Sequence, residues 1–385
     1  MTQHVATEKA TMVELLRWDG VFTPAILEDW RDLLRRIPDA PVFLHPEWLG
    51  YAAAAGLERP TRLLRISLRG RALALLPLVP RGPGAWMAAT PFCMDTAVRL
   101  VDPVTAPQAW QGIGTAMRRW PSLGLLSPGM INRAETLAEL HAMADAGALP
   151  LCDHALDPSY LVPLAGEWPL FLAGLRPSMR EKLRRGDQYL ARHPDHARVT
   201  AAMTPREIAV TLEALFCLYR QRWGGQVGGS PLCPPRNAAF YRTVLPWAVA
   251  HDYGALLALS LDGRTLAVGS MLHIPEQPVA YYHFTVRDDT AERLPDALSS
   301  PGLVLTGHVI QWAIARGARA LCMGRGAADY KRQLGADGRP LWQPVLARSP
   351  LAGALLPPLG EGLHILARLP VHLRHHLRRV SRRAA

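Results

Sequence analysis

The chain has few cysteines and no long apolar run. Its five cysteines are scattered, include no CxxC pair and are odd in number: Cys93, Cys152, Cys217, Cys233 and Cys322. This set excludes an obvious disulfide framework or zinc cluster and favours a reducing compartment. No stretch approaches the roughly 18 apolar residues of a membrane-spanning helix, and the N-terminus lacks the apolar run of a signal peptide. We therefore expect a cytoplasmic protein.

Several motifs of nucleotide, covalent and metal chemistry are absent as well. The sequence has no phosphate-binding P-loop, no GxGxxG after a strand and no Ser/His/Asp triad motif. No cysteine lies in a motif that argues for a covalent enzyme intermediate. The 14 histidines do not cluster at ligand spacing outside the C-terminal tail. We predict no metal site and no permanently bound cofactor.

The length and composition indicate a folded protein of about two domains. The chain has 385 residues, of which 49% are hydrophobic and 19% charged, so it can bury sizeable cores. Its net charge of +11 permits contact with phosphates, anionic lipid or acidic glycans. Charge alone does not indicate sequence-specific nucleic-acid binding, and no binding motif supports it.

Two similar segments predict antiparallel hairpins. They are LLRISLRGRALALLPLV, residues 63–79, and LLALSLDGRTLAVGSML, residues 256–272, which share eight of seventeen positions. Each turns at a residue followed by Gly, and Gly adopts the positive φ that a two-residue turn requires. The strands are apolar at nearly every position, as in a sheet covered by helices on both faces. Duplication of one unit and convergence of two Leu-rich hairpins both remain open.

The remaining pattern predicts two mixed α/β halves that meet near residue 165. In the first half we expect helices over 22–37, 45–57, 106–120 and 132–148 and strands over 63–79, 124–128, 149–155 and 159–164. In the second half we expect helices over 167–193, 204–223, 238–254 and 301–317, strands over 254–274, 278–286 and 318–324, and a final turn or helix over 327–335. Thr204, Pro205 and Glu207 form a helix-start pattern.

The order helix, helix, hairpin, strand, loop, helix, strand resembles the GNAT acetyltransferase fold. The residues that carry the resemblance are FLAGLRPSMREKLRRGDQYL, LFCLYRQRWGG, AYYHF, SSPGLVL and GRGAADYKRQLG, with HPEWLGY upstream. Residues 166–335 resemble the CelD/BcsL-type acetyltransferase domain, which is similar to the FemABX peptidyltransferases. The resemblance extends over about residues 40–345.

The resemblance implies an α/β fold with two tandem GNAT-like units, each a mixed, mostly antiparallel sheet flanked by helices. It predicts a degenerate unit over 1–165, an acyltransferase unit over 166–350 and a basic tail over 351–385. The implied reaction moves an acetyl or related acyl group from acetyl-CoA or another acyl-CoA to an amine or hydroxyl. The acceptor would be a small molecule or a glycan, as in exopolysaccharide or cell-envelope biosynthesis.

Two alternatives stay open for the function. One is a FemABX-like transferase that uses aminoacyl-tRNA as donor, which the basic charge would suit. The other is a non-catalytic GNAT-derived module in an exopolysaccharide assembly. An acyl carrier protein is a further donor, because the usual phosphate signature Gln/Arg-x-x-Gly-x-Gly/Ala is missing from RDDTAERLPDALSSPG.

By the same resemblance, the donor pyrophosphate would lie at the start of helix 301–317. Unpaired backbone N–H groups and the helix dipole favour an anion there. The predicted donor-binding residues are Ser300, Pro301, Gly302 and Leu303. Ser-Pro is also simply a good helix start, so a purely structural role is the alternative.

Tyr330 matches the family position that protonates the departing thiolate. Lys331 would stabilise an oxyanion or a phosphate, Asp329 would orient either residue, and His283 is the candidate base. Further predicted substrate contacts are Tyr282, Arg325 and Arg180. The structural alternatives are a surface ion-pair cluster for 329–332, packing for the strand residues and a solvated helix face for Arg180.

The C-terminal segment 361–385 predicts a basic amphipathic helix. Leu366, Leu369, Leu373, Leu377 and Val380 recur at steps of three and four, among arginines and histidines. Such a helix can lie on an anionic membrane surface, although Pro370 interrupts its start. Docking of the apolar stripe on the protein itself is the alternative.

Overall fold

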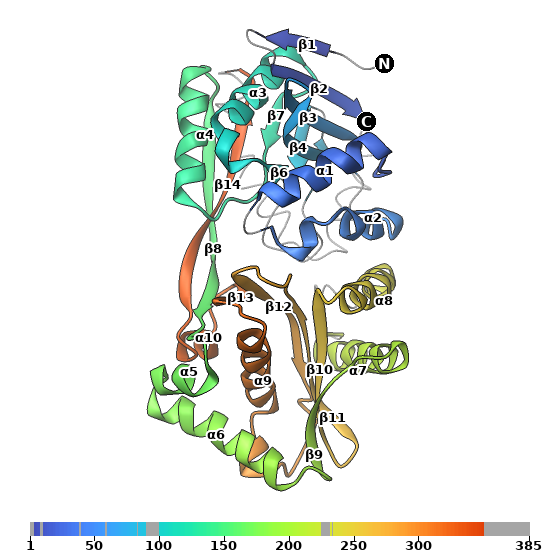
Figure 1. The fold of residues 1–385 in the computed structure, drawn as a ribbon, viewed down its shortest axis with the longest axis vertical. Helices are drawn as coiled ribbons and strands as arrows, with labels where there is room; N and C mark the ends of the chain where they lie inside the picture. Colours follow the sequence, from blue (N-terminus) through green and yellow to red (C-terminus); the bar gives the residue numbers. More distant parts are fainter. Residues whose placement is uncertain are drawn as a thin grey trace.

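The structure is a computed structural model that describes residues 4–7, 11–37, 40–57, 60–82, 84–89, 100–224, 232 and 234–349. The tail 361–385 lies outside the described residues. The chain forms two halves stacked along the long axis and joined by two long neighbouring strands, β8 and β14 (Figure 1). Each half places helices on both faces of its part of one continuous sheet.

Within the described residues, the first unit contains four helices and the strands up to residue 163. Its helices are α1 (Pro24–Arg36), α2 (Pro46–Ala54), α3 (Ala106–Arg119) and α4 (Ala134–Ala146), with short 3-10 turns η1 (Val42–Leu44) and η2 (Pro103–Thr105). Its strands are β1 (His4–Thr7), β2 (Thr11–Arg17), β3 (Arg62–Leu68), β4 (Arg71–Gly82), β5 (Ala85–Ala88), β6 (Leu100–Val101), β7 (Leu125–Ser127) and β8 (Leu151–Pro163).

The second unit repeats this plan. Its helices are α5 (Trp168–Gly174), α6 (Pro177–Arg192), α7 (Pro205–Trp223), α8 (Pro235–Ala250), α9 (Pro301–Ala315) and α10 (Asp329–Gln333), with η3 (Asp296–Leu298). Its strands are β9 (Ala197–Ala201), β10 (Gly254–Leu261), β11 (Arg264–Leu272), β12 (Val279–Arg287), β13 (Ala320–Arg325) and β14 (Asp337–Ala347). The capping box at Thr204 and Glu207 is present as predicted.

The two similar hairpins occupy equivalent places in the two units. In the first unit β3–β4 is followed by antiparallel β5, which pairs in parallel with β7. In the second, β10–β11 is followed by antiparallel β12, which pairs in parallel with β13. Both hairpins carry a β-bulge at the same aligned step, Ile66/Ser67 and Leu259/Ser260. These shared features confirm the tandem arrangement and favour duplication over convergence.

The last strand of each unit crosses to the other unit. β8, which closes the first unit, pairs antiparallel with β13 of the second. β14, which closes the second, pairs antiparallel with β7 of the first. β8 and β14 also pair with each other along most of their length. The sheet of the described strands is therefore continuous through both units, in the order β1-β2-β3-β4-β5-β7-β14-β8-β13-β12-β11-β10-β9.

Three main apolar clusters hold this arrangement. One fills the first unit between its sheet and α3–α4, and one lies beneath α6 and α9 in the second unit. The third joins the units, because it packs Trp30 and Trp48 of the first with Phe216, Phe240 and Tyr241 of the second. Burial of these large rings stabilises the contact between the units.

The structure corrects several predicted elements. The single helix over 167–193 is two helices, because Pro177 begins α6 and Leu175 is extended. The two strands predicted over 149–164 are one continuous β8. Strands β2, β9 and β14 were not predicted. Among the described residues, no helix is both long and apolar enough to cross a membrane.

Candidate functional site

A split in the sheet of the second unit forms the candidate site. β12 and β13 pair in parallel only from Val279–Tyr281 to Ala320–Cys322, and no further β12–β13 pairing follows. The chain leaves β13 through Gly324 and Gly326, whose φ values of 69° and 89° suit glycine. Beyond Tyr281 the edge of β12 therefore has no β13 neighbour.

Helix α9 begins beside the far end of β12. Ser300 is its N-cap, but the Ser300 side chain makes no capping hydrogen bond. The main-chain O of Ser300 accepts from the N–H groups of Leu303 and Val304, and Pro301 has no N–H. Within the described residues, the Gly302 N–H has no acceptor. A Cβ on Gly302 would lie 3.7 Å from Arg287 Cβ, so the helix start and the end of β12 are in contact.

Two arginines that the sequence reasoning missed share the carboxylate of Asp289, and one of them, Arg287, contacts this helix start. Arg287 Nε donates to Asp289 Oδ1 at 2.7 Å, and Arg222 Nε lies 3.3 Å from Asp289 Oδ2. Two guanidinium groups thus share one carboxylate, which leaves the group net positive. The positive end of the α9 dipole adds to this field. Arg222 lies in the segment LFCLYRQRWGG, which carries part of the resemblance, and Arg287 follows the segment AYYHF. Only the tertiary fold brings α7 and β12 together.

Two tyrosines occupy the base of the split. The buried Tyr282 OH lies 3.3 Å from Thr306 Oγ1 of α9, and burial raises the pKa of Tyr282 to about 12. Tyr330 of α10 packs half-buried against the same core and is close enough to raise the pKa of Tyr282. Burial also raises the pKa of Tyr330, although the Arg222 charge opposes the shift. Both phenols therefore hold their protons at neutral pH.

Lys331 does not face the split. Its Nζ donates to the main-chain oxygens of Gly324, Arg325 and Gly326 at 3.1, 3.0 and 3.1 Å, and it lies 5.5 Å from the Tyr160 ring centre. An ammonium has three protons, and these three carbonyls account for all of them. The predicted oxyanion role is thus corrected, because Lys331 holds the chain where it leaves β13. Arg325 joins this group through its main chain, and its side chain is exposed.

His283 lies on the other face of β12 from Tyr282. Its ring centre is 5.8 Å from that of Trp48 and 5.5 Å from that of Tyr241, in the core that joins the two units. Its Nε2 is buried and has no hydrogen-bond partner among the described residues. Burial lowers the pKa of His283 to about 3. So weak a base, away from Tyr330, does not fit the predicted role, and packing explains it better.

The other predicted residues also lie apart from the split. Arg180 donates from Nη2 to the oxygens of Ala173 and Leu175, both at 2.9 Å, and so closes the end of α5. Asp329 is exposed and lies 3.5 Å from Arg332. Tyr282 lies close to Tyr330 and also contacts Thr306, whose hydroxyl donates to the main-chain oxygen of Gly302 at 2.7 Å. Arg180, His283, Lys331 and Asp329 have the other partners described above.

The corresponding helix start in the first unit is already occupied by a protein carboxylate. Buried Asp102 accepts a hydrogen bond from the Val104 N–H at 3.0 Å, in the turn that leads into α3. Arg36 of α1 donates to the other oxygen of this carboxylate. The Asp102 carboxylate thus accepts the hydrogen bond of an N–H at the helix start in the first unit. In the second unit the Gly302 N–H has no such acceptor among the described residues.

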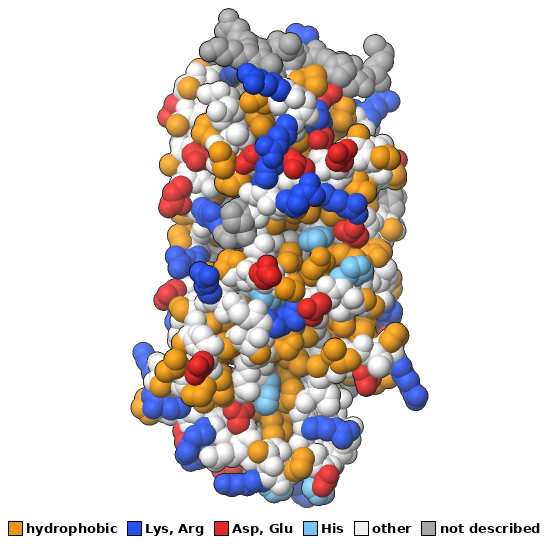
Figure 2. Space-filling view, viewed as in Figure 1, with side chains coloured by type: hydrophobic (Ala, Val, Ile, Leu, Met, Phe, Trp, Pro, Cys, Tyr) orange, Lys and Arg blue, Asp and Glu red, His pale blue; other side chains and the backbone are white. Residues whose placement is uncertain are grey.

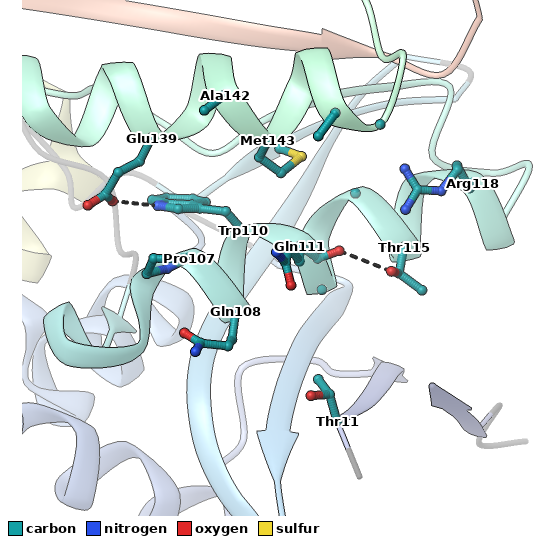
Figure 3. Close-up of a pocket in the computed structure, with 14 residues that line it drawn as sticks. Thr11, Pro107, Gln108, Trp110, Gln111, Thr115, Arg118, Glu139, Ala142 and Met143 are labelled. Carbon is teal, nitrogen blue, oxygen red and sulfur yellow. Dashed lines mark hydrogen bonds between the residues drawn. The ribbon is translucent and has the colours of Figure 1, made fainter. Parts of the chain in front are cut away.

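A separate groove of about 710 Å³ lies between α3 and α4 of the first unit. Figure 3 shows Trp110 lying across it, and Trp110 Nε1 donates to Glu139 Oε2 at 3.0 Å. Arg118 lies at the other end of the groove, near Met143 and Thr115 (Figure 3). None of the residues predicted for the site lines this groove. We therefore place the candidate site at the split between β12 and β13.

Comparisons with known proteins relate this chain to acetyltransferases and to FemX. Residues 177–332 match the family described as "Acetyltransferase (GNAT) domain". The solved structure of FemX is similar with a TM-score of 0.58 at 10% identity, over 86% of this chain and 96% of that one. L-PGS from Bacillus licheniformis is similar with a TM-score of 0.50 at 15% identity, over 86% and 95%. No curated protein matches the chain in sequence. Residues 177–332 therefore form an acetyltransferase (GNAT) domain, within a chain whose fold is similar to that of FemX.

Proposed function

We propose that the protein is an acyltransferase that moves an acetyl or related acyl group from a CoA thioester to an amine or hydroxyl. The observation that carries this proposal is the split between β12 and β13, with the α9 start and two arginines at one end and Tyr330 at its base. The split then offers both residues for phosphate binding and a residue for proton donation. The acceptor, including a polysaccharide precursor, remains a prediction of the resemblance.

The residues present fit the phosphates of a CoA ester. The Gly302 N–H is available, Gly302 has no side chain to keep a phosphate away, and Arg222 and Arg287 supply the charge. Arginine binds phosphate oxygens through two parallel N–H groups. Because Asp289 already orients both guanidinium groups, little side-chain freedom is lost on binding.

Tyr330 would act on the sulfur. When the acceptor nitrogen or oxygen attacks the thioester carbonyl, a C–N or C–O bond forms and the C–S bond breaks. The Tyr330 O–H then gives its proton to the departing thiolate, and the proton lost by the acceptor restores the phenol through solvent. This chemistry needs a phenol that is protonated at neutral pH, which the raised pKa of Tyr330 provides.

Substitution of the two arginines tests donor binding. We expect Arg222→Gln and Arg287→Gln each to weaken the binding of acetyl-CoA about tenfold, or about 1.4 kcal/mol. Isothermal titration measures the dissociation constants. Arg242→Gln is the matched control, because Arg242 also pairs with a carboxylate, Glu213, but on the exposed α7–α8 surface. Equal affinity of all three variants and the parent protein would count against this site.

A tRNA-linked donor is the second candidate, and the FemX-like fold and the charge of +11 favour it. Purification with and without ribonuclease, followed by analysis of bound RNA, distinguishes the two donors. Retained tRNA together with no affinity for any CoA ester would select this candidate. Acetyl-CoA binding by RNA-free protein would select the first.

A further inference from the structure

A second hollow lies at the seam between the two units, away from the split. It has a volume of about 520 Å³ and is formed by α1, the start of α2, the end of α8 and the turn between β11 and β12. Figure 2 shows histidine side chains, with Lys or Arg side chains nearby, at the surface where the two halves meet. Gln277 of this hollow precedes β12, whereas Arg287 ends it, and nine strand residues span roughly 30 Å. The hollow is thus distinct from the proposed phosphate site.

The hollow contains acceptor atoms that lack donors. Glu47 Oε2 and Gln277 Oε1 are buried and have no hydrogen-bond partner among the described residues. Arg31 Nη2 approaches the carboxylate of Glu47 only through Oε1, at 3.6 Å. His45 Nδ1 lies 3.8 Å from Glu47 Oε2, beyond hydrogen-bond distance, and burial lowers the pKa of His45, which favours its neutral form. A buried carboxylate oxygen without a donor is costly, so a ligand that donates to it gains binding energy.

The walls of the hollow also suit a cation. The Tyr253 ring centre lies 5.0 Å from that of His45 and 5.8 Å from that of Trp247. His251 Nδ1 lies 2.8 Å from the Trp247 main-chain oxygen, which can only accept, so Nδ1 carries a proton. Aromatic faces attract ammonium groups, and the two unpartnered acceptors, Glu47 Oε2 and Gln277 Oε1, favour an ammonium that carries N–H bonds.

We propose that this hollow, which we call the seam pocket, binds a ligand with a primary ammonium group on a short apolar body. The N–H groups of the ammonium donate to Glu47 Oε2 and Gln277 Oε1, and the apolar body lies against Trp247 and Tyr253. Arg31 and Arg35 also line the hollow: Arg31 is the competing cation for Glu47, whereas Arg35 pairs with Asp32 at 3.5 Å. This site is independent of the proposed acyl transfer, because it requires no acyl donor and lies at the opposite end of β12 from Arg287.

Binding of n-butylammonium to the full-length protein tests the seam pocket, with n-butanol as the uncharged probe of similar size. Saturation-transfer NMR titration should show n-butylammonium bound at least tenfold more tightly than n-butanol. Glu47→Gln should weaken n-butylammonium binding about tenfold, because the charge is lost while the shape is kept. Arg31→Gln should instead tighten it about threefold, because the competing cation is removed.

Glu28→Gln is the matched control, since Glu28 is an exposed carboxylate on α1 that does not line the pocket. It should bind n-butylammonium like the parent protein. Equal affinity for the two probes, or unchanged affinity in both Glu47→Gln and Arg31→Gln, overturns the proposal. If Glu47→Gln does not fold, as judged by circular dichroism, Arg31→Gln and the probe comparison still decide the question, as neither depends on that variant.

Discussion

Tyr330→Phe is expected to lower kcat about a hundredfold or more, while the affinity for acetyl-CoA stays within about twofold. A general acid contributes roughly 10²–10⁴ in rate, and the phenylalanine ring fills the same space at the base of the split. Tyr330 lies half-buried against the second-unit core, so loss of the hydroxyl leaves the packing intact. The value of kcat is measured from the release of free CoA, whose thiol reacts with a chromogenic disulfide.

The pH profile of the parent protein sharpens this test. Burial raises the pKa of Tyr330 above its usual value of 10, so the phenol stays protonated near neutral pH. Deprotonation of Tyr330 therefore lowers the rate only at higher pH. We expect no fall of kcat from this group between about pH 7 and 9. Tyr189→Phe on α6 is the control variant, and it should keep the parent rate. A Tyr330→Phe enzyme with full kcat would rule out the assigned role.

Lys331→Met is expected to lower the free energy of unfolding by about 2–4 kcal/mol. The methionine keeps an apolar stem, but the three carbonyl oxygens at Gly324, Arg325 and Gly326 lose their charged donor. Unsatisfied buried acceptors cost about 1–3 kcal/mol each, less where water can reach them. Urea denaturation followed by circular dichroism gives the free energy of unfolding.

Exposed Lys182 of α6 supplies the comparison, and Lys182→Met should change stability by less than about 0.5 kcal/mol. A Lys331→Met protein with parent stability and a large loss of kcat would instead restore the catalytic role that the sequence suggested. A structural role of Lys331 therefore predicts a loss of stability in Lys331→Met, whereas a catalytic role predicts a loss of kcat.

Elements with strong local signals could be predicted from the sequence. The paired hairpins, the capped α7 and the Ser-Pro start of α9 follow from turn glycines, capping residues and periodicity, which are local. Tyr330 and the residues 300–303 entered through the resemblance, and in the structure Tyr282 lies close to Tyr330 and to Thr306 of α9.

The rest depends on contacts between distant segments. Arg222 and Arg287 meet on Asp289 only when α7 packs over the end of β12, and no local pattern encodes that meeting. Lys331 was predicted to act on the substrate because it is charged. Its contacts with three carbonyl oxygens depend on the turn after β13, which no local sequence pattern reveals. The packing of His283 could not be predicted, because a histidine in a strand sequence does not indicate which face of the sheet is buried in the core. β14 was missed since its partners lie far away in the chain.

The exchange of β8 and β14 has a consequence for synthesis on the ribosome. β7 in the first unit receives its β14 neighbour from residues near Leu346, which emerge only after all the other described helices and strands of both units have been made. Until then β7 and β8 each have an unpaired edge, and exposed strand edges invite pairing with other chains. Because domains normally fold as they emerge, this chain must complete both units late and together. A nascent chain that stops before β14 would therefore be prone to aggregation, even though all the described helices and the strands β12 and β13 would already have been made.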